Sequence, residues 1–287
     1  MKLAILGAES LHAADFAALL AGKDGRKLFA DVELVGIYAD KDLADSEAGI
    51  KIIREKSSCK YFTNDYKDFL SKVDGVIITS RHGSKHLAYA RPYLERGIPV
   101  WVDKPICSDV QEIIELTELA RKNNTSVIGG SSLAVSKEIT DLSAYIKENR
   151  SAVQGGHITA PIHMNSEYDG FWFYAPHAVQ MMTEVFGTKI RRVRAHRGMN
   201  YVQAIYEYDD FPVSVYFGTG YTVTLYKDNY SAEPMKVSPG SNEQLLEEFY
   251  NLVKKGTVIE DYKEFIAPVR LIDATIKAYE QEIVVEL

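Results

Sequence analysis

Asp103, Lys104 and His177 are of residue types that can hold and move a proton. Asp103 and Lys104 follow the short apolar stretch 97–102 and precede Pro105, which stops a strand. An apolar run this short, with β-branched residues, predicts a strand that is buried on both faces. Ligands bind at the carboxyl ends of parallel strands, where this charged pair is expected. The alternative is a solvated lysine beside a proline.

His177 follows a stretch rich in glycine and aromatic residues, 170–176, at the start of a predicted helix. With an unperturbed pKa of about 6.5, an imidazole can accept a proton near neutral pH. The sequence therefore predicts a general base at His177, whereas the alternative is a histidine that is only a satisfied polar group. Lys104 is expected to hydrogen-bond the substrate oxygen from which His177 would take the proton. This chemistry requires the two side chains, which are expected in different domains, to converge.

The first predicted strand ends in a degraded phosphate-binding loop. Gly7 opens a turn into an alanine-rich helix, as in a dinucleotide-binding domain. That turn usually carries GxGxxG, but Glu9 and His12 stand here at the second and third glycine positions. Ser10 can still donate a hydrogen bond, and the helix that begins near Leu11 still attracts anions at its N-terminus. Glu9, in contrast, brings a negative charge toward a pyrophosphate.

Further predicted strands end in polar residues. The strand 33–38 leads to Asp40, whose carboxylate would accept hydrogen bonds from ribose hydroxyls and repel a 2′-phosphate. This favours NAD as cofactor without excluding NADP, since Lys41 is adjacent; alternatively, Asp40 caps a helix. The strand 73–78 leads to further polar candidates. The cofactor-binding candidates at this edge are Gly7, Ser10, Leu11, Asp40, Thr79, Ser80, His82, Asp103 and Lys104.

The order of elements predicts two domains. In the first half, helices alternate with strands, which is typical of a doubly wound parallel sheet, the Rossmann fold. From residue 129, consecutive strands joined by short turns predict an α+β domain with an open, largely antiparallel sheet. The chain is therefore divided into a dinucleotide-binding domain, residues 1–128, and a domain for substrate binding and oligomerisation, residues 129–287. Further helices are expected at residues 43–49, 65–71, 86–94, 108–123 (capped by Ser108), 136–149, 176–186, 242–255 and 263–280.

Composition limits the classes of function. The formal net charge of −7 argues against nucleic acid as a partner, because nucleic-acid binders usually carry a basic stripe. No apolar run approaches the roughly 18 residues that a membrane span needs, and the first is shorter than the core of a signal peptide. Cys59 and Cys107 are isolated in the sequence, so we expect neither a disulfide nor a metal site, and a cytoplasmic location.

Tyrosines are frequent in the predicted strands of the second domain. Because helices can cover only one face of an open sheet, an aromatic opposite face predicts a subunit interface, and hence a homodimer or homotetramer. The alternative is ordinary cross-strand pairing. The tyrosines concerned are Tyr206, Tyr208, Tyr216, Tyr221 and Tyr226.

Over nearly its whole length the chain resembles the glucose–fructose oxidoreductase, inositol dehydrogenase and MocA (Gfo/Idh/MocA) family. Asp103-Lys104-Pro105 is similar to the family's strand-end Glu-Lys-Pro, and Thr79 with His86 to its Thr-Pro…His segment. Gly170…His177 resembles the family's glycine-then-histidine helix. The resemblance implies an NAD(P)-dependent oxidoreductase that transfers a hydride between nicotinamide and a secondary alcohol or ketone of a sugar- or cyclitol-like substrate.

The chain departs from the family pattern at two acidic positions. The family's second motif reads Asp-x-Gly-x-His-x-x-Asp, whereas Phe173 and Gln180 stand here at the aspartate positions. Asp169 or Tyr174 could substitute for the first aspartate. The second hypothesis is therefore a non-catalytic protein of the same fold that senses a dinucleotide or a sugar.

Overall fold

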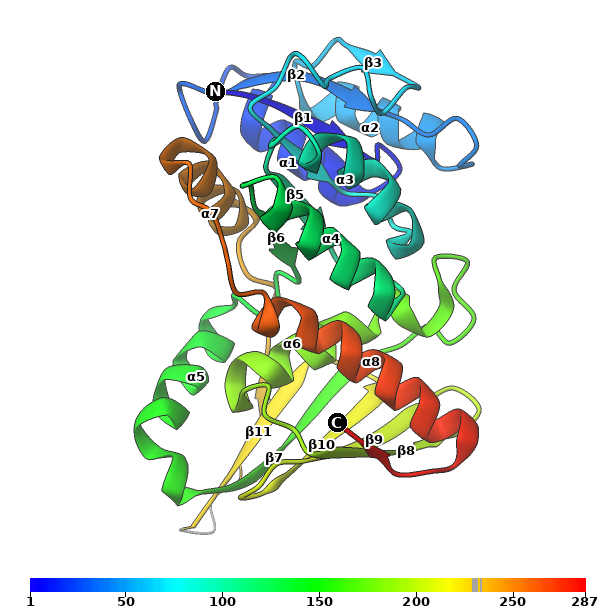
Figure 1. The fold of residues 1–287 in the computed structure, drawn as a ribbon, viewed down its shortest axis with the longest axis vertical. Helices are drawn as coiled ribbons and strands as arrows, with labels where there is room; N and C mark the ends of the chain where they lie inside the picture. Colours follow the sequence, from blue (N-terminus) through cyan, green and yellow to red (C-terminus); the bar gives the residue numbers. More distant parts are fainter. Residues whose placement is uncertain (229–231, 233) are drawn as a thin grey trace. The chain divides into compact units, whose positions relative to one another are not determined.

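The computed structural model describes residues 1–228, 232 and 234–287. The chain forms two compact units (Figure 1). The first comprises Met1–Gly129 and Asn242–Tyr262, and the second comprises Gly130–Ser241 and Lys263–Leu287. The division after Gly129 lies one residue from the expected boundary, but a later segment returns to the first unit.

The first unit contains a six-stranded sheet in the order β3-β2-β1-β4-β5-β6, the order of a Rossmann domain. β1 pairs in parallel with β2 and β4, and β4 with β5, so their carboxyl ends share one edge of the sheet. The doubly wound fold predicted from the sequence is confirmed. The strands are β1 (Lys2–Leu6), β2 (Glu33–Tyr38), β3 (Phe62–Thr63), β4 (Gly75–Ile78), β5 (Val100–Asp103) and β6 (Val127–Gly130).

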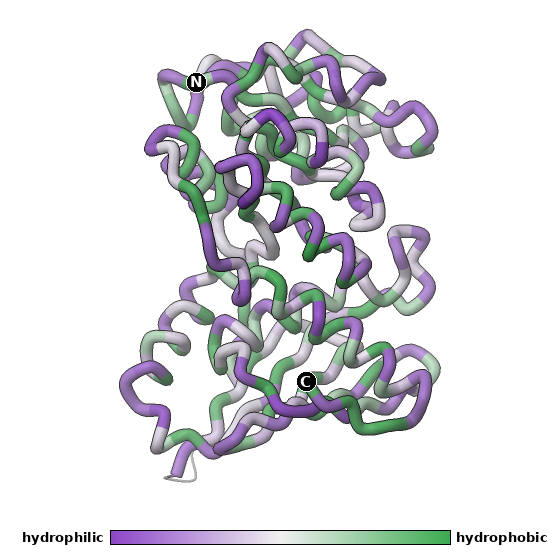
Figure 2. Tube along the Cα trace, in the orientation of Figure 1, coloured by the Kyte–Doolittle hydropathy of each residue, from purple (hydrophilic) through white to green (hydrophobic). Residues whose placement is uncertain are grey.

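The helices of the first unit bury one side each. In α4, for example, Ile113, Leu116 and Ala120 are buried and recur at helical spacing. Figure 2 shows the corresponding alternation of hydrophobic and hydrophilic residues along the helices. The helices are α1 (Leu11–Ala21), α2 (Ser46–Lys56), α3 (His86–Leu94), α4 (Val110–Lys122) and α7 (Asn242–Lys255).

Three local predictions were wrong in this unit. Residues 65–71 form turns and no helix, because Thr63 and Asp65 accept N–H groups two residues ahead and close local turns. α2 begins only at Ser46, because turns occupy the residues directly after Asp40. The N-cap of α4 is Asp109 and not Ser108: its carboxylate accepts the N–H groups of the second and third helical residues, at 2.6 and 3.1 Å.

The segment around α7 belongs to the first unit, although the sequence-based division placed it in the second domain. Tyr250 stacks on Phe29 with ring centroids 4.1 Å apart. Farther along, the hydroxyl of Tyr262 accepts the N–H of Val127 at the start of β6, at 3.0 Å. The helical pattern shows that α7 buries one face, but it does not show which sheet that face covers.

The second unit contains a seven-stranded sheet in the order β12-β11-β7-β10-β9-β8-β13. Among the described strand pairs of this sheet, only β7 and β10 are parallel, so the predicted, largely antiparallel sheet is confirmed. Helices α5 (Lys137–Asn149), α6 (Ala175–Phe186) and α8 (Lys263–Gln281) lie on one face of this sheet (Figure 1). The strands are β7 (Val153–Pro161), β8 (Arg192–Arg197), β9 (Val202–Glu207), β10 (Pro212–Gly218), β11 (Thr222–Lys227), β12 (Pro234–Lys236) and β13 (Val285–Glu286).

The tyrosines of this sheet divide between its two faces. Tyr206 and Tyr208 are buried, and the hydroxyl of Tyr206 lies 2.6 Å from that of Thr275 in α8. Tyr226 is exposed and Tyr216 half-buried. The aromatic outer face is therefore smaller than expected, because the side chains of β9 alternate and Tyr206 falls on the helix-covered side.

Within the described residues, none of the helices has both the length and the apolar character to cross a bilayer. The same part of the chain contains no group of three or more metal-ligating side chains. Cys59 and Cys107 are buried free thiols.

Candidate functional site

Gly7 makes a turn at the end of β1 that only glycine can make. Its φ is +120°, and a Cβ there would lie 2.4 Å from the backbone nitrogen of Ser80. The hydroxyl of Thr79 donates to the carbonyl of Gly7 at 2.9 Å. The ends of β1 and β4 are thus held together at the edge where a dinucleotide was expected.

The loop after Gly7 folds its acidic side chain inward. Glu9 is 3% exposed, and its Oε1 accepts the N–H of Arg81 at 3.3 Å. Its Oε2 is buried without a hydrogen-bond partner among the described residues. Ser10 caps α1 by accepting the N–H of His12 at 3.2 Å, and Leu11 is the exposed first residue of the helix. Ser10 thus contributes an acceptor to its own helix.

Asp40 lies at the end of β2 as predicted, but other parts of the chain bind its carboxylate. Lys85 and Tyr89 donate to Oδ2 at 2.9 and 2.8 Å, and the N–H of Asp42 donates to Oδ1 at 3.0 Å. Burial acts to raise the pKa of Asp40, but these hydrogen bonds hold that pKa below its ordinary value. A ribose at this position would compete with Lys85 and Tyr89.

Asp103 and His12 form an ion pair that the sequence did not reveal. Oδ2 of Asp103 lies 2.6 Å from Nδ1 of His12, and Oδ1 accepts the N–H of Lys104 at 2.8 Å. The charge of Asp103 raises the pKa of His12, against the opposing effect of burial. Burial likewise acts to raise the pKa of Asp103, but the charge and hydrogen bond of His12 hold it below its ordinary value.

Lys104 is a buried lysine at the end of β5. Lys104 is 9% exposed. Burial lowers the pKa of its ammonium, with a smaller opposing effect from the charge of Asp103. Nearby, the fully buried ring of His86 has Nε2 2.8 Å from the carbonyl of Ser80 and Nδ1 3.0 Å from that of Ile106. His86 therefore connects the segments that follow β4 and β5.

Of the remaining candidates, Thr79 and Ser80 are fully buried. The hydroxyl of Ser80 accepts the N–H of His82 at 3.4 Å. All the cofactor candidates thus follow the carboxyl ends of parallel strands in one unit. His177 belongs to the other unit.

His177 lies near the start of α6, in a set of hydrogen bonds centred on Ser131. Its Nδ1 is 2.6 Å from the hydroxyl of Ser131, whose backbone N–H donates to Oε1 of Gln180 at 2.6 Å. The rings of Tyr174 and Tyr221 lie 5.5 and 5.7 Å from the imidazole. Gln180, at a position where the family has an aspartate, is thus engaged with the backbone. Asp169 precedes the short 3-10 helix Gly170–Phe173, with a φ of +64°.

A cavity of about 560 Å³ opens within the second unit, beside the loop that follows β7. Its walls combine the rings of Tyr168, Phe173 and Tyr174 with the polar side chains of Asn165 and Glu167. Phe173, which replaces the other family aspartate, thus contributes an apolar ring.

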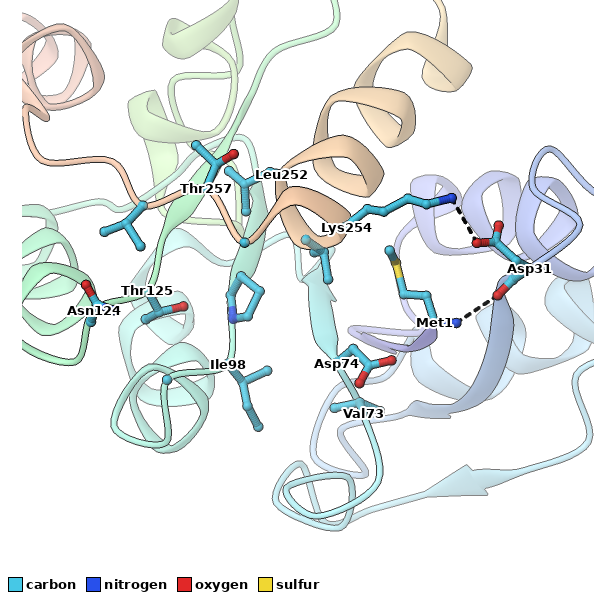
Figure 3. A pocket seen from close by; sticks show the side chains of 15 residues that line it. Met1, Asp31, Val73, Asp74, Ile98, Asn124, Thr125, Leu252, Lys254 and Thr257 are labelled. Atoms are coloured by element: carbon cyan, nitrogen blue, oxygen red, sulfur yellow. Dashed lines mark hydrogen bonds and ion pairs between the residues drawn. The ribbon is translucent and has the colours of Figure 1, made fainter.

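A cavity of about 590 Å³ in the first unit is lined by none of the cofactor-binding candidates; Figure 3 shows the residues that line it. It is formed by segments that precede strands, such as those of Asp74 and Ile98. The amino group of Met1 donates to the carbonyl of Asp31 at 2.8 Å, and Lys254 pairs with the Asp31 carboxylate at 3.2 Å. This cavity is therefore at the amino edge of the sheet, opposite the edge with Lys104, and ligands of such sheets bind at the carboxyl edge.

Residues 1–131 match the sequence model of a family described as "Oxidoreductase family, NAD-binding Rossmann fold". These first 131 residues are similar to the Rossmann domain of the Gfo/Idh/MocA family. The predicted resemblance is confirmed for this part of the chain, and the family is one of NAD-binding oxidoreductases. No curated protein sequence matches the chain.

Solved structures extend the similarity in fold to the second unit. The myo-inositol 2-dehydrogenase of Lactobacillus plantarum has a TM-score of 0.79 at 13% identity, with coverage of 100% of this chain and 99% of the other. The myo-inositol dehydrogenase of Corynebacterium glutamicum has a TM-score of 0.76 at 14% identity, with coverage of 100% and 98%. The biliverdin reductase of Synechocystis, solved with biliverdin and NADP+, has a TM-score of 0.74 at 16% identity, with coverage of 97% and 99%. These likenesses show the fold alone.

The residues at the carboxyl edge fit a dinucleotide, with altered chemistry at the loop. Gly7 keeps the tight turn, and the N-terminus of α1 remains an electropositive end. Glu9 is turned inward to the backbone of Arg81, and His12 adds a side chain that can be cationic. The sequence predicted that the loop and Lys104 lie at strand ends, but it missed the His12–Asp103 pair because 91 residues separate the partners.

Proposed function

We propose that this protein is an NAD(P)-dependent dehydrogenase that acts on a secondary alcohol or ketone of a sugar- or cyclitol-like substrate. The observation that carries the proposal is Lys104, a buried lysine with a lowered pKa at the end of β5 in an NAD-binding oxidoreductase domain. A bound nicotinamide supplies the hydride chemistry, and the protein supplies orientation and proton transfer.

In the proposed mechanism Lys104 binds the substrate oxygen and stabilises the negative charge that develops on it during oxidation. Because burial already lowers its pKa, Lys104 can also release or accept a proton more readily than an exposed lysine. His177 is the proposed general base. A neutral imidazole carries one N–H, so donation from Nδ1 to the hydroxyl of Ser131 would leave Nε2 as the basic nitrogen.

The cofactor is proposed to bind along the carboxyl edge of the first unit's sheet, with NAD expected and NADP not excluded. The loop Gly7–Leu11 would hold the pyrophosphate, and Thr79, Ser80, His82 and Asp103 would line the nicotinamide half. Asp40 would meet the adenosine ribose. Its contact with Lys85 weakens the preference for NAD, because an ammonium next to this carboxylate offers a partner for a 2′-phosphate.

The cavity beside the 3-10 helix supports a polyhydroxylated substrate. Aromatic rings can cover the C–H face of a sugar ring, and amide and carboxylate groups can bind its hydroxyls. The rings of Tyr168, Phe173 and Tyr174 and the polar groups of Asn165 and Glu167 form such a combination in the second unit.

The test is turnover on a panel of polyols, cyclitols and their ketones, followed by absorbance of the reduced nicotinamide. The wild type is expected to turn over at least one of them with NAD or NADP, and Lys104→Ala is expected to lose most of this rate. Lys122→Ala, which removes an exposed lysine of α4, is the matched control. A Lys104→Ala variant that keeps the wild-type rate would contradict the role of this residue.

The second candidate is a non-catalytic sensor of a dinucleotide or sugar, and one specific observation favours it. Phe173 and Gln180 replace both family carboxylates, and Gln180 is bound to the backbone of Ser131. Tight binding of a dinucleotide in calorimetry, without turnover of any polyol or ketone, would favour this candidate over the enzyme.

We further propose a cytoplasmic homodimer or homotetramer that assembles through the outer face of the second unit's sheet. Ile205 and Tyr226 are exposed there, and Tyr201 stacks on Tyr216 with centroids 5.4 Å apart. The two buried thiols, Cys59 and Cys107, suit a reducing compartment. Light scattering of the wild type and of Ile205→Glu tests this assembly: the variant is expected to be smaller, and a monomeric wild type would contradict it.

A further inference from the structure

His12 stands where the dinucleotide-binding loop of a Rossmann domain has its third glycine. It is the second residue of α1: Ser10 is the N-cap, Leu11 is the first helical residue, and His12 follows. In a Rossmann domain the pyrophosphate lies at this helix N-terminus. A side chain at this position prevents the close helix–strand packing that glycine allows, so it must either turn away from the ligand or contact it.

The ring of His12 is held in one orientation by a buried carboxylate. Its Nδ1 lies 2.6 Å from Oδ2 of Asp103, and this oxygen accepts the Nδ1–H. Among the described residues, none forms a hydrogen bond with Nε2. The side chain is 28% exposed, compared with 4% for that of Asp103. Nδ1 is thus occupied by Asp103, and Nε2 is the ring nitrogen that remains for a ligand.

The charged groups around His12 favour its protonated form. Asp103 on β5 has the largest effect and raises the pKa of His12, as does Asp15 one turn along the same helix. Burial and the nearby charge of Lys104 act in the opposite direction but do not cancel the effect of Asp103. An imidazolium has N–H donors on both ring nitrogens, so one can serve Asp103 while the other serves an anion.

We propose that His12 is a cofactor-binding residue whose Nε2–H, in the protonated form, donates to the pyrophosphate of the dinucleotide, so that affinity falls as the pH rises. The inference rests on the proposed function, because it presupposes a dinucleotide at this edge of the sheet. In the proposed complex, a charge-assisted hydrogen bond from His12 takes the place of the backbone contact that a glycine loop makes with the pyrophosphate. Because the bound form needs the proton, binding takes up a proton whenever His12 is neutral in the free protein.

The test is the Kd of the full chain for NADH, measured by calorimetry from about pH 6 to about pH 9. The wild type is expected to bind about tenfold or more weakly at the alkaline end, as loss of one charge-assisted hydrogen bond implies. His12→Asn is expected to bind weakly at every pH and to lose this dependence. His196→Asn, which changes an exposed histidine of β8, should behave as the wild type.

Failure of this inference differs from failure of the proposed function. If the wild type binds NADH and His12→Asn keeps both its affinity and its pH dependence, His12 is not a cofactor ligand, whereas the dinucleotide site stands. If the wild type binds neither NADH nor NADPH at any pH, both proposals are overturned.

A second measurement covers the case in which His12→Asn does not fold. The imidazole signals of His12 in the wild type can be titrated by NMR with and without saturating NADH. The pKa of His12 is expected to rise on binding, because a neighbouring pyrophosphate favours the imidazolium. An unchanged titration at saturation would show that His12 only connects α1 to β5.

Discussion

The hydroxyl of Ser131 lies 2.6 Å from Nδ1 of His177, and the backbone N–H of the same serine donates to Gln180. Ser131 follows β6, whereas the other two residues lie on α6. One serine thus orients the proposed base and the amide that replaces a family carboxylate. The hydroxyl of Ser131 also accepts the N–H of Leu133 at 3.2 Å, which fixes its own position.

Substitution of His177 should remove proton transfer, and substitution of Ser131 should only disturb its geometry. We expect His177→Asn to lower kcat by about 10²–10⁴-fold, the usual contribution of a general base. Ser131→Ala should lower kcat by about tenfold, because the imidazole keeps its basicity but loses the partner that selects its tautomer. The kcat–pH profile of each variant is the measurement. Ser151→Ala, at an exposed serine, is the control; a wild-type kcat in His177→Asn would show that the base lies elsewhere.

Lys104→Met should lower the activity and raise the thermal stability. The folded-state pKa of Lys104 lies below the ordinary 10.5, so the folded chain binds fewer protons than the unfolded chain between the two values. Stability therefore rises with pH through that window, and below it the buried ammonium is a net cost. Methionine removes this cost, and we expect Tm at pH 7 to rise by about 2–4 °C for each kcal/mol gained.

Thermal unfolding of the wild type and Lys104→Met near pH 7 and near pH 10 is the measurement. The two curves should approach each other at the alkaline end, where the lysine is neutral. Lys122→Met provides the same change at an exposed site and should leave Tm nearly unchanged. A lower Tm for Lys104→Met at pH 7 would mean that its ammonium contributes to the fold.

The parallel sheet was predictable because short apolar runs alternate with helices, and the bounds of β2 match the expected strand 33–38. The unit to which α7 belongs was not predictable. The pattern of an amphipathic helix shows that one face is buried, but it does not show which sheet covers that face. Only the stacking of Tyr250 on Phe29 and the contact of Tyr262 with Val127 assign it to the first unit. Such contacts join residues more than a hundred positions apart.

The candidate site was predictable where a strand end fixes a residue's place, as it does for Lys104. The hydrogen-bond partners of the site residues were not predictable, because they lie at the ends of different strands, far apart in the sequence and without a characteristic spacing. Asp40 illustrates this point: it is on the expected edge, but Lys85 and Tyr89, from the region of α3, already bind its carboxylate. The residue type predicted that Asp40 accepts hydrogen bonds from a ribose, whereas in the structure two side chains of the chain itself donate to this carboxylate.

Removal of the charge of Glu9 should strengthen dinucleotide binding. Its carboxylate lies in the loop that would hold the pyrophosphate, and Oε2 has no hydrogen-bond partner among the described residues. Glu9→Gln keeps the acceptor for the N–H of Arg81 and removes the repulsion. We expect Kd for NADH to fall about threefold to tenfold, or roughly 0.7–1.4 kcal/mol. Glu47→Gln makes the same charge change at an exposed position of α2; equal gains in both variants would point to net charge alone.

Gly7→Ala and Gly25→Ala separate backbone strain from collision. Both glycines have positive φ, +120° and +81°, so a side chain at either position is strained by about 1–3 kcal/mol. A Cβ at Gly25 would meet nothing within 4 Å, whereas a Cβ at Gly7 would lie 2.4 Å from the backbone nitrogen of Ser80. Gly7→Ala must therefore also separate the ends of β1 and β4, and we expect it to lower the free energy of unfolding more than Gly25→Ala. Urea unfolding of both variants measures the difference, and equal losses would show that the strand ends can part without cost.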